Sequence, residues 1–282
     1  MPNMIVFSRG ERHVFAIVLT LIITMALAGC AGKNQEQTQG QAGQQSPARE
    51  GTQQETLLVY SGAGLRKAMD EIGRVFQEQT GIHVSFSYAG SAQNNNQILL
   101  SRKGDVCIPG DVTELEPLRK EKLVTWEKKV VYHIPALAVP KGNPAGIKQL
   151  ADLAKPGVKV VLGDPKTNPM GKVSDAVLQK AGLLEKVNKN VVARTPTINE
   201  LLVYVSMKQA DAAIIGVENY PEFKDRVDIV PLPELQEVNM VVPVAVLACS
   251  AQPDRARLFA EFVASDQARA IWEKNGFKPY RE

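Results

Sequence analysis

Residues 57–92 read LLVYSGAGLRKAMDEIGRVFQEQTGIHVSFSYAGSA, and this stretch decides the fold class. Its apolar ends, 57–61 and 84–88, have the length and composition of short buried strands. The segment between them has apolar side chains spaced by four, three and four positions, at Leu65, Met69, Ile72 and Phe76. That spacing predicts a helix with one buried stripe between the two strands.

The same alternation continues along the chain. Further apolar, β-branched runs predict strands at 105–108, 136–139, 158–162, 212–215 and 242–248. Another helix is predicted where apolar residues recur at helical spacing, at Ile198, Leu201, Leu202 and Val205. Alternating strands and helices predict an α/β fold with mainly parallel sheets, helices on both faces, and a ligand site at the carboxyl ends of the strands.

The composition excludes several classes of protein. With 282 residues, 44% hydrophobic and 22% charged, the chain is globular and too long for one core of average size, so two lobes are expected. Its 33 basic and 30 acidic residues give a net charge of only +3, which does not predict a nucleic-acid partner. The three histidines and three cysteines lack the spacing of a metal site. Cys107 and Cys249 are expected to be buried thiols, although the sequence leaves a disulfide between them open.

The N-terminal segment predicts export. Arg9 and Arg12 precede an apolar run over 14–28, which is short for a membrane span and ends in small residues. These features predict a signal peptide over 1–29, with an N-terminal transmembrane anchor as the alternative. The ending Leu27-Ala28-Gly29-Cys30 resembles a bacterial lipobox, which implies that Cys30 is lipidated and anchors the protein to a membrane. Residues 30–54 contain eight glutamines and no large apolar residue, which predicts a flexible tether spanning about 27 Å.

Four segments, 60–65, 89–93, 164–171 and 195–200, pass from small or polar residues directly into a predicted helix. A helix start carries about half a positive charge and several unpaired N–H groups. If the four starts converge, they form a site for a compact, fully ionised oxyanion that needs no arginine.

Each segment also has an ordinary structural interpretation. Glycines at 62 and 64 fit a simple turn, and Ser91 fits an N-cap that satisfies its own helix. Pro169 fits the first helical position, which leaves the amides of Met170 and Gly171 exposed. A capping box is predicted from Thr197 and Glu200.

An enzyme is not predicted. Asp105 and Asp111 are candidates for the paired carboxylates that acid-base chemistry would require, with His83 or His133 as a partner. No nucleophile, base and orienting group occur together at a supporting spacing, so loop and capping roles are expected for both aspartates.

At the same four segments the chain resembles the molybdate-binding proteins of ABC importers, within the type II periplasmic binding-protein superfamily. The resemblance extends from about Thr56 to Tyr280 and rests on the order and spacing of residues 60–92, 103–111, 160–183, 210–220, 243–250 and 259–277. It implies two lobes, 55–139 plus 242–282 and 140–241, that close on a ligand about a hinge.

The resemblance also implies a ligand site built from hydroxyls and backbone amides at helix starts. Its positions fall on Gly64, Ser91, Met170 and Ile198. The family's serine hydroxyl is absent at Gly64, and Gly216 stands where the family often has a ligand-binding tyrosine. Each missing donor is worth about 1–3 kcal/mol to a buried charged ligand. The candidates to replace these donors are Ser61, Gln93 and Asn94.

The expected function is that of a substrate-binding lipoprotein of an ABC importer. It would capture molybdate or tungstate between its lobes as a monomer and deliver the anion to the permease at the cell envelope, with no cofactor or metal. Two alternatives stay open. The small residues at 64 and 216 suggest a wider pocket for an organic acid or a phosphonate, and the same fold can serve an envelope signalling lipoprotein.

Overall fold

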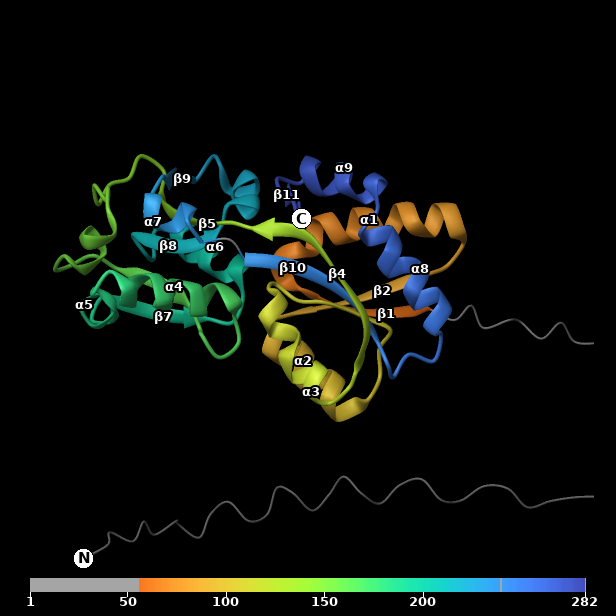
Figure 1. Ribbon diagram of the computed structural model, residues 1–282. Helices are drawn as coiled ribbons and strands as arrows, with labels where there is room; N and C mark the ends of the chain where they lie inside the picture. Colours follow the sequence, from red (N-terminus) through yellow and green to blue (C-terminus); the bar gives the residue numbers. More distant parts are fainter. Residues whose placement is uncertain (1–55, 239, 282) are drawn as a thin grey trace, which may run out of the picture. The chain divides into compact units, whose positions relative to one another are not determined.

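A computed structural model describes residues 56–238 and 240–281, all within one compact unit, Thr52–Glu282. The predicted signal peptide, Cys30 and the predicted tether lie outside the described residues. The described part contains two β-sheets flanked by helices (Figure 1), which is the predicted two-lobe α/β class. No helix within it is long and apolar enough to cross a membrane.

The first sheet has the strand order β11-β4-β10-β3-β1-β2. β1 runs parallel to β2 and β3, whereas β10 and β11 run antiparallel to their neighbours, so the sheet is mixed. The strands are β1 (Leu57–Gly62), β2 (Val84–Ala89), β3 (Val106–Ile108), β4 (Val124–His133), β10 (Met240–Leu247) and β11 (Lys278–Pro279).

Helices cover both faces of the first sheet (Figure 1). Alternate residues of β1 point to opposite faces, as the pleat requires. Leu57 and Val59 pack with α1, α8 and α9, and Tyr60 packs with α2 and α3. The helices are α1 (Arg66–Thr80), which follows the 3-10 turn η1 (Ala63–Leu65), α2 (Ser91–Ser101), α3 (Glu116–Lys120), which follows η2 (Val112–Leu115), α8 (Pro253–Val263) and α9 (Asp266–Lys274).

The second sheet has the strand order β7-β6-β8-β5-β9, with parallel pairs on one side and antiparallel pairs on the other. One apolar core joins this sheet to its helices. The strands are β5 (Pro135–Pro140), β6 (Val160–Gly163), β7 (Val191–Thr195), β8 (Ala212–Gly216) and β9 (Val227–Val230). The helices are α4 (Pro169–Lys180), α5 (Leu184–Asn188), α6 (Ile198–Ser206) and α7 (Pro233–Gln236), with the 3-10 segments η3 (Leu150–Ala154) and η4 (Val217–Phe223).

The chain crosses between the sheets where β4 is followed by β5 and where it enters β10. β4 ends at His133 in the first sheet, and β5 begins at Pro135 in the second. A lobe boundary after residue 139 would leave β5 with the first sheet, but β5 pairs with β8 and β9 because its apolar residues pack in the second core. On the return, Met240 pairs with His133, so both crossings lie side by side.

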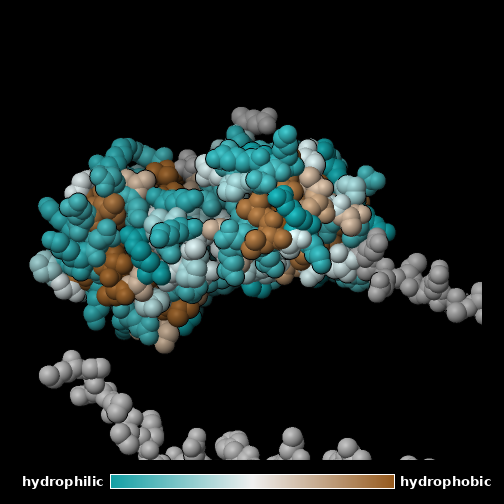
Figure 2. Space-filling view, turned by 90° about the horizontal axis from the view of Figure 1, so that it is seen from below, coloured by the Kyte–Doolittle hydropathy of each residue, from teal (hydrophilic) through white to brown (hydrophobic). Residues whose placement is uncertain are grey.

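The face in Figure 2 is mostly hydrophilic, with separate hydrophobic patches. Among the described residues, Leu100 near the end of α2 and Met207 after α6 are the most exposed large apolar side chains, at 88% and 60%. They lie on or next to helices that pack against different sheets, and single exposed apolar residues are normal on a globular domain. Neither residue by itself indicates a partner.

Candidate functional site: an oxyanion-sized cavity between the lobes

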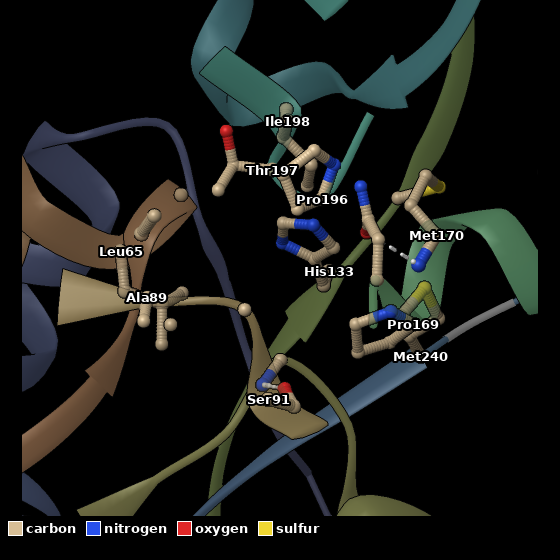
Figure 3. A pocket seen from close by; sticks show the side chains of 16 residues that line it. Leu65, Ala89, Ser91, His133, Pro169, Met170, Pro196, Thr197, Ile198 and Met240 are labelled. Atoms are coloured by element: carbon tan, nitrogen blue, oxygen red, sulfur yellow. Dashed lines mark hydrogen bonds between the residues drawn. The ribbon is translucent and has the colours of Figure 1, made fainter. Parts of the chain in front are cut away.

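A cavity of about 30 Å³ lies between the two lobes. A cavity holds one water when this volume reaches about 10–15 Å³, so there is room here for a group of only a few heavy atoms. Residues 62–65, 89–91 and 110 line it from the first lobe, residues 168–170 and 196–198 line it from the second, and His133 and Met240 line it from the crossings (Figure 3).

Four helices begin at this cavity because the strands before them end there. α1 follows β1 through η1, α2 follows β2, α4 follows β6 and α6 follows β7. Since β1 and β2 are parallel, as are β6 and β7, each pair delivers two helix starts to the same edge of its sheet. Four starts together present roughly two positive charges to the cavity, enough to balance a dianion.

The structure brings together four of the six residues proposed from the sequence. Gly64, Ser91, Met170 and Ile198 line the cavity, whereas Ser61 and Gly216 do not. Ser61 is fully buried, and its hydroxyl is 3.4 Å from the carbonyl oxygen of Gly62. A serine directly after an apolar run suggested a hydroxyl donor to the ligand, but the Ser61 side chain points into the protein.

Ser91 presents its hydroxyl differently from the prediction. The N-cap of α2 is Gly90, and Ser91 is the first helical residue. A β-carbon at Gly90 would lie 2.7 Å from the carbonyl oxygen of Thr167 and 2.9 Å from that of Pro196, so the close approach of the second lobe requires glycine at the cap. The Ser91 Oγ instead accepts the N–H of Gly110 at 3.3 Å, which leaves its O–H able to donate into the cavity.

At α4 the prediction of exposed amides is wrong. The side-chain oxygen of Asn168 caps the helix by accepting the N–H of Met170 at 3.0 Å, and the Asn168 carbonyl accepts the N–H of Gly171 at 2.9 Å. Asn168 itself is 3% exposed and lines the cavity. Its Nδ2 has no hydrogen-bond partner among the described residues, so this amide is the donor that α4 offers.

At α6 the predicted capping box is not formed. The hydroxyl of Thr197 donates to the carboxylate of Glu200 at 2.8 Å and caps no backbone group. Among the described residues the N–H of Ile198 has no recorded partner, and Ile198 lines the cavity. The amide of Ile198 is therefore available to a ligand at the positive end of the helix.

The space next to Gly216 is filled rather than open. A β-carbon there would lie 1.9 Å from Oε1 of Glu218 and 2.7 Å from Cε1 of His133. The expectation that glycine at 216 widens the pocket is therefore wrong, because His133 and Glu218 take the space of a larger side chain. Nor do the proposed replacement donors reach the cavity: Gln93 is exposed, and the Asn94 Nδ2 donates to the Ser61 carbonyl at 2.9 Å.

Polar contacts between the lobes close around the cavity. The Asn219 Nδ2 donates to the carbonyl of Gly64 at 2.7 Å. Lys172 Nζ pairs with Oε1 of the largely buried Glu114 at 2.6 Å. Together with the contacts at Gly90, these interactions define a closed arrangement of the two lobes.

The remaining titratable candidates have structural roles. Asp105 accepts the N–H of Leu58 at 2.7 Å and the hydroxyl of Ser250 at 2.5 Å, and Asp111 caps η2. Cys107 and Cys249 are free thiols, and burial raises the pKa of Cys107 to about 12. Among the described residues no cluster of His, Cys, Asp and Glu has the geometry of a metal site.

Sequence comparison identifies the family. Residues 57–278 match the sequence model of the bacterial extracellular solute-binding proteins. The chain belongs to this family. A solute-binding protein is a component of transport and not an enzyme, which agrees with the structural roles of Asp105 and Asp111.

The individual relatives described next are each less than 30% identical to this solute-binding protein. The molybdate-binding protein ModA of Mycobacterium bovis is 28% identical over 234 residues, which cover 82% of this chain and 88% of the relative. The sulfate-binding protein SubI of Mycobacterium tuberculosis superposes with a TM-score of 0.73 at 20% identity, covering 79% of this chain and 86% of SubI. The periplasmic molybdate-binding protein of Azotobacter vinelandii gives a TM-score of 0.66 at 18% identity, covering 80% of this chain and all of that one.

Proposed function

We propose that this solute-binding protein captures one tetrahedral oxyanion, molybdate or tungstate, between its lobes and delivers it to the permease of an ABC importer. The observation that carries the proposal is the small cavity where four helix starts from two lobes meet. Its available donors are a serine hydroxyl, a carboxamide and backbone amides, and the residues that line it include no carboxylate to repel an anion.

The charge balance of the cavity favours a fully ionised dianion. Helix starts supply partial positive charges on N–H groups that the fold already holds in place. Binding an anion there does not require a charged side chain to be ordered or stripped of water. A tetrahedral anion also matches donors that approach from several directions, such as the Ser91 hydroxyl and the Ile198 amide from opposite lobes. Similarity to a molybdate-binding relative supports the same class of ligand.

The size of the cavity favours a small inorganic oxyanion over the larger alternatives. An organic acid with several carbon atoms would need more room than about 30 Å³, and the contacts at Gly90 and Asn219 hold the lobes together. Sulfate remains a competing ligand, because it has the same geometry and charge and because the sulfate-binding protein SubI has the same fold. The larger oxyanions are preferred if the donors are spaced for longer metal–oxygen bonds.

The proposal extends to the parts of the chain around the binding unit. Cys30 carries the lipid, the 24-residue segment after it is the tether, and the protein acts as a monomer at the outer side of the membrane. The sheets and their helices are the two lobes, with divisions at residue 134 and directly before Met240 instead of after residues 139 and 241. The two crossings beside His133 and Met240 are the hinge.

Isothermal titration calorimetry with molybdate, tungstate, sulfate and phosphate tests the function. We expect one site per chain, micromolar or tighter affinity for at least one of the first two anions, and a weaker response to phosphate. No heat with any of the four would refute the proposal. Tighter binding of sulfate than of molybdate or tungstate would keep the transport function and change its cargo.

A further inference from the structure

His133 is a buried histidine on the wall of the cavity. It is the last residue of β4, its side chain is 2% exposed, and Figure 3 shows its ring among the residues of both lobes that line the cavity. Of the described residues that line the cavity, it is the one with a titratable side chain. The contacts that define the function above do not use it.

Glu218 lies directly behind this histidine. Its side chain, in η4 after β8, is 1% exposed, and its Oε1 is 2.6 Å from Nδ1 of His133. The two atoms are in ion-pair contact but are not aligned as a hydrogen bond, and neither oxygen of Glu218 has a hydrogen-bond partner among the described residues. An ionised carboxylate buried without hydrogen-bond donors is costly unless a positive charge lies beside it, and among the described residues the His133 imidazole is the group in ion-pair contact with Glu218 that can carry that charge.

The residues around the ring fix its orientation. Nδ1 faces Glu218, and Cε1 faces Gly216, where any β-carbon would collide with the pair. Phe277 stacks on the ring with centroids 6.4 Å apart, and Met240 pairs with His133 across the strands. Glu218 is thus the one titratable neighbour among these packing residues, and Nε2 is the ring nitrogen that remains for the cavity.

We propose that His133 is a ligand-binding residue, whose protonated imidazole donates from Nε2 to the bound oxyanion while Glu218 acts as its positioning residue. The inference rests on the proposed function and adds a charged donor to it. Fully ionised oxyanions are then favoured, since every oxygen can accept this proton. Loss of the proton at higher pH would turn Nε2 into an acceptor and weaken binding of a dianion.

Calorimetry with molybdate or sulfate over about pH 6–8, where both anions remain dianions, tests this inference. We expect the wild-type affinity to fall as the pH rises. His133→Gln should bind about 10- to 100-fold more weakly at the low end and show little pH dependence. Glu218→Gln should keep a histidine at the wall but lose affinity most strongly at the high end, because the imidazolium is no longer held by a carboxylate.

His83→Gln is the matched control, because it removes a histidine away from the cavity, and its affinity and pH profile should equal those of the wild type. Wild-type affinity and pH profile in His133→Gln would overturn the inference and leave the function intact. Failure of the wild type to bind any oxyanion would instead refute the function.

A spectroscopic measurement avoids dependence on the folding of the His133 variants. In the full chain with His13→Gln and His83→Gln, His133 is the one histidine, so its ring nitrogens give a unique pair of NMR signals. In the anion complex near pH 7 we expect both nitrogens to be protonated. An unprotonated Nε2 in that complex would overturn the inference.

Discussion

Substitution of Gly90 by alanine should prevent the lobes from closing. The added β-carbon would lie 2.7 Å from the Thr167 carbonyl oxygen and 2.9 Å from the Pro196 carbonyl oxygen. Carbon–oxygen contacts normally begin at about 3.3 Å, so the second lobe must move back by on the order of half an ångström. Both obstacles are backbone atoms at the starts of α4 and α6, which cannot move aside without moving the donors there.

That displacement sets the size of the expected effect. A hydrogen bond of about 2.9 Å to Asn168 Nδ2 or to the Ile198 amide would lengthen to about 3.4 Å, beyond the normal range. Bonds to a charged ligand contribute about 1.5–3 kcal/mol each, so weakening one or two costs about 2–4 kcal/mol. The affinity for the anion should fall about 30- to 1,000-fold.

The assay is calorimetric titration of Gly90→Ala with the tightest-binding oxyanion, accompanied by urea denaturation without ligand. The φ angle of Gly90 is −64°, which alanine adopts freely, so the free energy of unfolding should change by less than about 1 kcal/mol. Gly110→Ala is the matched control, because its β-carbon would meet only the Pro169 side chain, at 3.4 Å. The loss of affinity in Gly110→Ala should be several-fold smaller than in Gly90→Ala. Wild-type affinity in Gly90→Ala would refute the reasoning that this glycine permits closure.

Further variants test the donor set, the capping interactions and the core. In Asn168→Asp the new carboxylate still accepts the Met170 N–H, so α4 should remain stable. The side-chain amide that donates to the ligand is replaced by a negative charge, so the affinity for the anion should fall more than about 100-fold. Calorimetry showing unchanged binding would contradict this. The hydrogen bond from the backbone N–H of Lys148, followed by that from the Lys155 ammonium, holds the pKa of Asp152 at about 2. This depressed pKa stabilises the fold above about pH 4 and ceases to do so as the pH falls towards 2, so Asp152→Asn should lower the urea midpoint at pH 7 and have little effect near pH 2. Because burial raises the pKa of Cys107 to about 12, alkylation at pH 8 should modify this thiol only after denaturant is added, and rapid modification of the native protein would show that the core opens there.

Hydrophobic patterns predicted strands in both sheets. Residues 57–61, 84–88 and 212–215 are uniform apolar or alternating runs, and each forms a strand close to its predicted bounds. The prediction missed β4, in which Glu127, Lys128 and Lys129 are exposed and lie beyond the two residues that pair with β11. Charged residues on an exposed edge protect it from pairing with other chains, but they also remove the apolar pattern by which a strand is recognised. The antiparallel pairs of both sheets were missed because no local pattern encodes strand direction.

The sequence predicted the segments that form the site better than the individual atoms that face the cavity. Strand-to-helix transitions pointed to the four segments, because helix starts after parallel strands gather at one sheet edge. The family resemblance pointed to Gly64, Ser91, Met170 and Ile198 within them, and these residues line the cavity. Which atom faces the ligand depends on packing between lobes that are distant in sequence. Gly90 occupies the N-cap of α2 because the backbone of the other lobe leaves no room for a side chain there.

Residues the prediction missed show the same limit. His133 and Glu218 are 85 positions apart, and only the folded chain shows that they meet beside Gly216. Asn168 directly precedes a proline at a helix start, which is a signal for a cap. That signal identifies the oxygen that caps α4 but not the Nδ2, which is buried and has no hydrogen-bond partner among the described residues.

The position of a bound tungsten atom tests the central claim most directly. Tungsten scatters X-rays anomalously, so a crystal grown with tungstate locates the metal independently of the surrounding density. We predict one tungsten atom per chain between the lobes, about 3.5–4.5 Å from the Ser91 Oγ and the Ile198 amide nitrogen, as donors at normal hydrogen-bond distance from its oxygens require. Tungsten bound elsewhere on the molecule, or held by one lobe alone, would contradict the account.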